Sequence, residues 1–124
     1  MFSALVAECP YADLREIAVY RLRPMLAMPL AKLVVGSGML YANLVDGLKL
    51  QQVSPVSVIA NVSAPILLIH GLNDTQTPPS NSEQLAKADP RAQLWLVPNA
   101  PHVGVSGIAP EEFRRRVLTW FADH

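Results

Sequence analysis

The stretch Ile66-Leu67-Leu68-Ile69-His70-Gly71-Leu72-Asn73-Asp74 decides the fold of this 124-residue chain. An apolar run of this length, bounded by turn residues, is typical of a β-strand buried on both faces. A second such run, residues 92–97, is followed after a short loop by His102. Chemistry in open parallel sheets gathers beyond the carboxyl ends of the strands. We therefore expect Asp74 and His102 to lie close together.

Strands and helices alternate along the whole chain. Apolar periodicity and the prolines predict strands over residues 3–9, 66–70 and 92–97. They predict helices over residues 11–22, 25–48, 55–59 and 81–88, and a last helix from Pro110. Such alternation implies parallel strands joined by right-handed crossovers. The expected fold is α/β, a three-stranded parallel sheet with flanking helices, and residues 1–124 form one domain or a piece of one.

Local signals refine three of these helices. Asp13 is suited to cap helix 11–22. Ser80-Asn81-Ser82-Glu83 has the pattern of a capping box, in which the first and last side chains each bind a free backbone N–H group. The apolar segment 25–48 is expected to form two helices broken near Gly36-Ser37-Gly38.

Composition excludes several classes of function. Lys plus Arg equals Asp plus Glu, so the net charge is zero and we expect no bulk attraction to nucleic acid or to an anionic membrane. Residues 25–44 approach the length of a bilayer span, but Pro29 and Lys32 interrupt them, which favours buried or lid helices over a transmembrane helix. We therefore expect no membrane partner.

The cysteine and histidine residues indicate the cellular compartment and bear on whether a metal is bound. The single cysteine, Cys9, allows no intrachain disulfide and fits a reducing compartment, and residues 1–5 lack the features of a signal peptide, so we expect a cytoplasmic protein. His70, His102 and His124 lack the short spacings of zinc sites. No metal and no cofactor is expected.

Asp74 and His102 have the residue types of acid–base chemistry, and two interpretations of each stay open. A carboxylate can orient a histidine, which then takes a proton from a nucleophile. Asp74 can equally cap a turn through its own backbone, and a single loop histidine can be structural or solvated. The joint pattern favours chemistry, since each residue follows a buried strand.

The residues around this pair resemble the α/β-hydrolase fold family, in its serine peptidase-like and esterase-like members. Residues 64–79 resemble the family's acid loop, where a strand is followed by His-Gly, two residues and Asp. Residues 96–102 resemble its histidine loop, although Asn99 and Pro101 replace the usual glycines. The resemblance covers the whole chain, is strongest over residues 54–121, and implies that Asp74 is the acid and His102 the base of a catalytic triad.

The nucleophile of such a triad is missing from the sequence. It normally sits on a sharp strand-to-helix turn with the pattern Gly-x-Ser-x-Gly. Residues 104–108 fail at the last position and follow no predicted strand, and residues 36–38 do not fit. Cys9 ends a strand but is followed by Pro10, so packing is its default role. Since residues 6–14 resemble the strand after the nucleophile helix, we expect only the carboxyl-terminal half of the fold here.

The resemblance also assigns the segment 24–50 to a helical cap or lid, the usual wall of the substrate pocket. Its apolar side chains suit acyl chains or apolar peptide side chains, with plain core packing as the alternative. Two functions remain. One is a serine hydrolase region for small ester, thioester or peptide substrates, inactive alone. The other is a non-catalytic interaction module, or half of a split enzyme, forming a homodimer or pairing with an N-terminal half through an exposed sheet edge.

Overall fold

The computed structural model describes residues 3–124 and contains one three-stranded parallel sheet. The strands are β1 (Leu5–Glu8), β2 (Ile66–Gly71) and β3 (Gln93–Val97), and they lie in the order β1-β2-β3. All six residues of β2 are buried, whereas β3 is only partly buried. The α/β fold and the parallel sheet predicted from the sequence are therefore confirmed, and the full burial predicted for both apolar runs holds for the central strand only.

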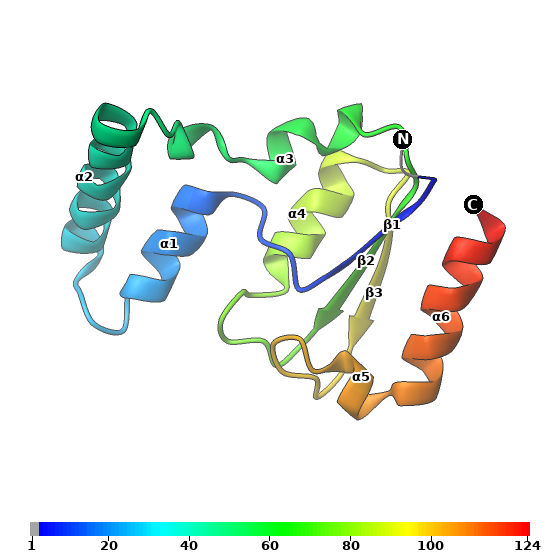
Figure 1. Ribbon diagram of the computed structural model, residues 1–124. Coiled ribbons are helices and arrows are strands. Elements are labelled where there is room, and N and C mark those ends of the chain that lie inside the picture. The colour runs from blue at the N-terminus through cyan, green and yellow to red at the C-terminus, as the bar shows by residue number, and fades with distance from the viewer. Residues whose placement is uncertain (1–2) are drawn as a thin grey trace.

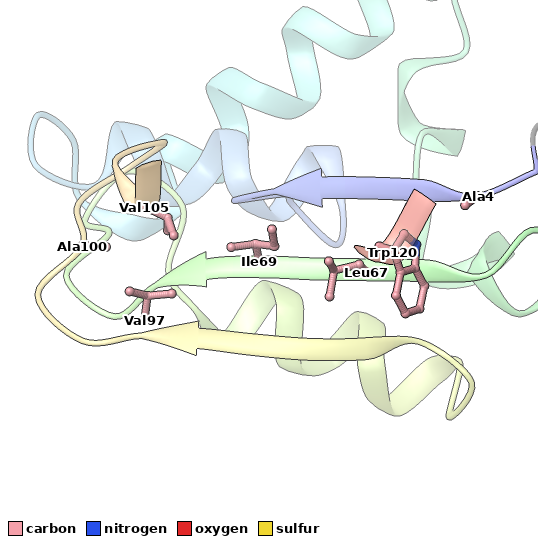
Figure 2. Packing of buried hydrophobic residues seen from close by; sticks show 7 residues of the cluster. All are labelled: Ala4, Leu67, Ile69, Val97, Ala100, Val105 and Trp120. Atoms are coloured by element: carbon pink, nitrogen blue, oxygen red, sulfur yellow. The ribbon is translucent and has the colours of Figure 1, made fainter. Parts of the chain in front are cut away.

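Helices cover both faces of this sheet (Figure 1). Successive side chains of a strand point to opposite faces. Leu67 and Ile69 therefore face α6 (Pro110–Asp123), where Figure 2 shows Trp120 packed over the sheet. Leu68 and Ile66 face the other way and pack with Leu85 of α4 (Ser80–Ala88). The alternation also directs His70 toward α4, and this orientation determines its contacts described below.

A pair of helices, α1 (Leu14–Leu22) and α2 (Met28–Asp46), projects away from the sheet (Figure 1). The Asp13 side chain accepts a hydrogen bond from the backbone N–H of Glu16 (3.1 Å), which confirms the predicted cap of α1. The break predicted near Gly36-Ser37-Gly38 is wrong, because α2 runs through all three residues. Each glycine costs about 1 kcal/mol in a helix interior. The buried Val35 and Met39, packed with α1, offset that cost.

The outer side of α2 is largely apolar and exposed. Leu33, Tyr41 and Leu44 are each more than 60% exposed. Among the described residues, α2 is the one helix that is long and apolar enough to span a membrane. Of its most apolar 18-residue stretch, 17% is buried.

The segment between α2 and β2 contains only short elements: η1 (Leu50–Gln52), α3 (Pro55–Val58) and η2 (Ile59–Asn61). The predicted capping box of α4 is wrong, because the helix already includes Ser80 and has no side-chain cap. The last predicted helix is confirmed as α6, but the loop before it also contains a short helix that the sequence did not predict, α5 (Val105–Ile108).

Candidate active site

The Asp74 side chain is fixed by the turn that follows β2. Its Oδ1 atom accepts hydrogen bonds from the backbone N–H groups of Gln76 (2.9 Å) and Thr77 (2.8 Å). The residue is only 4% exposed. This is the local turn suggested as the alternative role of Asp74, yet it uses one oxygen only. The second oxygen, Oδ2, remains free to receive another donor.

His102 supplies that donor. Its Nδ1 atom lies 2.8 Å from Oδ2 of Asp74. Because an ionised carboxylate can only accept, Nδ1 carries the proton and Nε2 is left as the basic nitrogen. The imidazole is 24% exposed, and Nε2 has no hydrogen-bond partner within residues 3–124. The two residues predicted from the sequence to meet are therefore in direct contact.

Gly71 allows the two loops to approach each other. The backbone N–H of Asn73 donates to the carbonyl of Ala100 (3.0 Å), which joins the acid loop to the histidine loop. A Cβ atom placed on Gly71 would lie 2.2 Å from that carbonyl oxygen. Only glycine fits at this position. The close contact between the two loops thus explains why the His-Gly motif has glycine at residue 71.

His70 contacts the same carboxylate, a contact that the sequence did not reveal. Its Nε2 lies 2.7 Å from the carbonyl oxygen of Thr77 and 3.2 Å from Oδ2 of Asp74. A carbonyl can only accept, so Nε2 carries the proton, and Nδ1 accepts from the Ser82 hydroxyl (2.6 Å). The imidazole is completely buried. His70 is thus held in place at the end of β2, and it also supports Asp74.

Cys9 joins the end of β1 to both loops. Its backbone has a left-handed φ of 49°, and its Sγ accepts a hydrogen bond from the backbone N–H of Val103 (3.4 Å). The thiol also hydrogen-bonds the carboxylate of Asp74. Burial, the strongest influence, raises the pKa of the Cys9 thiol. A thiol kept protonated in this way is a poor nucleophile, which agrees with a packing role.

Opposing effects act on the acidity of Asp74. Burial favours the neutral form, but the hydrogen bonds from Thr77, His102, Cys9 and Gln76 together hold the pKa of Asp74 below its ordinary value. Asp74 is therefore ionised at neutral pH. An ionised carboxylate is what the orientation of a basic histidine requires.

Cys9, His70 and Asp74 also form a cluster in which the potential ligand atoms lie within 4.8 Å of one another. Both ring nitrogens of His70 are already hydrogen-bonded to protein groups. A metal ion bound here would have to displace Ser82 or Thr77 from the imidazole. The donor set therefore fits a hydrogen-bond network better than a metal centre.

The serines considered as nucleophiles do not reach His102. Ser106 is exposed within α5, and Ser37 is exposed within α2. Neither forms a hydrogen bond with His102 within residues 3–124. The described part of the chain thus contains a carboxylate and an imidazole in contact, with no hydroxyl hydrogen-bonded to the imidazole.

The fold has close counterparts among solved structures. Esterase Pf2001 of Pyrococcus furiosus superimposes with a TM-score of 0.64 at 19% identity, over 98% of this chain and 45% of that chain. The meta-cleavage product hydrolase CumD of Pseudomonas fluorescens superimposes with a TM-score of 0.61 at 18% identity, over 98% of this chain and 56% of that chain. At these identities the likeness establishes the fold. The chain has the architecture of an α/β-hydrolase, over about half the length of these proteins.

The family follows from the sequence comparisons. All 124 residues match the model of the prolyl oligopeptidase family, and the chain belongs to that family. It is 33% identical over 99 residues to the uncharacterized protein YqkD of Bacillus subtilis, covering 78% of this chain and 32% of that protein. It is 41% identical over 73 residues to the pimeloyl-[acyl-carrier protein] methyl ester esterase of Nitrosomonas europaea, covering 58% of this chain and 29% of that enzyme. The chain thus spans about a third or less of the length of these curated relatives.

Proposed function

We propose that this chain supplies the acid and the general base of a serine hydrolase that cleaves an ester, thioester or peptide bond. The observation that carries the proposal is the 2.8 Å contact between Nδ1 of His102 and Oδ2 of the buried Asp74. In the neutral imidazole this contact places the proton on Nδ1, so Nε2 of His102 is the basic nitrogen, and it has no protein hydrogen-bond partner within residues 3–124. A nucleophilic hydroxyl hydrogen-bonded to Nε2 would complete a triad.

In this proposal the roles are divided between residues. His102 takes the proton from the nucleophile during attack and returns it to the leaving group. Asp74 holds His102 in the correct tautomer and stabilises the imidazolium that forms. His70, with its N–H group 3.2 Å from Oδ2, fixes the position of Asp74. The nucleophile and the oxyanion-binding N–H groups would come from a part of the hydrolase domain that lies outside these 124 residues.

The exposed side of α2 suggests which substrates fit. Exposed apolar residues extend along the helix, and an apolar cap segment suits acyl chains or apolar peptide side chains. One sequence relative is an esterase, and the family is named after a peptidase. We therefore assign a small ester or peptide substrate to the complete enzyme, with α2 as part of its cap.

Labelling with a fluorophosphonate probe tests this proposal. The probe reacts with serines that a basic histidine activates. The isolated chain is expected to remain unlabelled, while a complete α/β-hydrolase measured in parallel is labelled. Covalent labelling of any serine of the isolated chain, identified by mass spectrometry, would contradict the assignment.

A second candidate is half of a split enzyme or an interaction module, and the sheet edge favours it. Within residues 3–124, β1 pairs only with β2, so its outer edge offers unpaired backbone groups to another chain. The expected state is a homodimer or a complex with a complementary half. Sedimentation of the purified chain tests this, and a stable monomer with cooperative unfolding would argue against it.

A further inference from the structure

A pocket of about 400 Å³ lies between α1 and α2, apart from the Asp74–His102 pair. Its volume is within the usual range of about 300–1,000 Å³ for small-molecule sites. The pocket is lined by residues of both helices, which pack side by side through Val19, Val35 and Met39. Figure 1 shows this helix pair at a distance from the sheet.

The charged side chains that line the pocket are mostly cationic. Arg15, Arg23 and Lys32 face it, with Glu16 as the one carboxylate among the lining residues. None of the three cations takes part in an ion pair within residues 3–124, although the whole chain carries no net charge. The carboxyl end of α1 and the amino end of α2 contribute opposite partial charges here, so the side chains set the sign of the potential.

The remaining lining residues give the pocket an apolar part. Val19 is 8% exposed and Met28 is 39% exposed. The ring of Tyr20 also lines the pocket, and the Arg23 guanidinium lies 5.4 Å from the centre of that ring. This contact holds Arg23 by a cation–π interaction. A ligand matching these surfaces has an anionic end and an apolar body.

The pocket is connected to the acid loop through α1. The Tyr20 hydroxyl donates to the carbonyl of Thr75 (3.2 Å), the residue after Asp74. The next residue, Arg21, donates through Nε to the carbonyl of Gln76 (3.2 Å). A ligand held against Tyr20 would therefore contact a helix that is fastened to the loop carrying the proposed triad acid.

We propose that this pocket binds the carboxylate or phosphate group of an amphipathic organic anion, with Arg15, Arg23 and Lys32 as its ligands. Guanidinium and ammonium groups form charge-assisted hydrogen bonds with such oxygens. The anionic class of the ligand follows from the pocket alone. That the ligand is the substrate, or its anionic end, rests on the proposed function.

Calorimetry with octanoate and octyl phosphate, both below their micelle concentrations, tests the pocket. We expect one or both anions to bind, octanol and octyltrimethylammonium not to bind, and the double variant Arg15→Gln/Lys32→Gln to weaken binding at least about tenfold. The comparison of the two anions distinguishes a carboxylate site from a phosphate site. Amide chemical shifts should change along α1 and α2.

The matched control is Lys87→Gln/Arg114→Gln, which removes two exposed positive charges from α4 and α6. The control should bind as the parent chain does, and circular dichroism checks that both variants are folded. Octanol binding as tightly as octanoate, neither anion binding, or equal affinities of the two double variants would overturn the proposal. Calorimetry measures binding without hydrolysis, so a failure of the anions to bind would leave the proposal for Asp74 and His102 unaffected. Conversely, fluorophosphonate labelling of the isolated chain would contradict that proposal but not the proposed anion pocket.

Discussion

Replacing Asp74 by Asn is the most informative perturbation of the site. The amide oxygen can keep the two backbone hydrogen bonds from Gln76 and Thr77. The amide nitrogen then takes the place of Oδ2 and faces the N–H groups of His102 and His70. These N–H groups thus meet a second donor instead of an acceptor. His102 can move its proton to Nε2, but His70 cannot, since its N–H group is bound to a carbonyl.

The magnitude follows from these contacts. A hydrogen bond to a charged group contributes about 1.5–3 kcal/mol, and a buried group left without a partner costs about 1–3 kcal/mol. Because the charged hydrogen bond to His102 becomes a neutral one and the contact between His70 and Oδ2 is lost, we expect Asp74→Asn to lower the free energy of unfolding at pH 7 by about 2–3 kcal/mol. Urea unfolding followed by the fluorescence of Trp95 and Trp120 measures this change.

The pKa shift of Asp74 determines how its contribution to the free energy of unfolding changes with pH. The folded pKa of Asp74 lies below its unfolded value, so its ionised form stabilises the fold above the unfolded pKa of about 3.9 and loses this effect as the pH falls through the folded pKa. The gap between parent and variant should therefore persist from pH 7 to about 5 and narrow below about 4. The control Asp13→Asn keeps its helix cap and should change stability by less than about 0.5 kcal/mol. If Asp74→Asn also changes the free energy of unfolding at pH 7 by less than about 0.5 kcal/mol, the assigned contacts do not stabilise the fold.

Two further substitutions test the packing around the site. Gly71→Ala should destabilise the chain by at least about 2 kcal/mol, because the new Cβ would clash with the Ala100 carbonyl; Gly107→Ala, whose Cβ meets nothing within 4 Å, is the control in the same urea experiment. Ser82→Ala should cost about 1–3 kcal/mol, since it leaves the buried Nδ1 of His70 without a donor. An unchanged unfolding midpoint for either test variant would show that the assigned contact does not stabilise the fold.

The sequence predicted those parts of the fold whose signals are local. The apolar run of β2 marks a strand buried on both faces, and the placement of Asp13 before α1 marks its cap. The meeting of Asp74 and His102 could also be predicted, because both loops follow neighbouring parallel strands and therefore open at the same edge of the sheet.

Other features depend on contacts between distant segments. The chain does not break at Gly36-Ser37-Gly38, since packing on α1 outweighs the local cost. Ser80 is the first residue of α4, where the capping-box pattern had predicted its N-cap, and Ser82 within the same helix donates to His70. The link from Cys9 to the histidine loop joins residues 94 positions apart, and no periodic pattern encodes it.

Nitrogen NMR of the histidine side chains tests the central claim most directly. In the neutral imidazoles, we expect His102 to carry its proton on Nδ1 and His70 to carry its proton on Nε2, which are opposite tautomers within one chain. In Asp74→Asn the His102 proton should move to Nε2 while His70 is unchanged. A His102 that is protonated on Nε2 in the parent chain, or that is indifferent to Asp74→Asn, would contradict the assignment of these two residues as an acid–base pair.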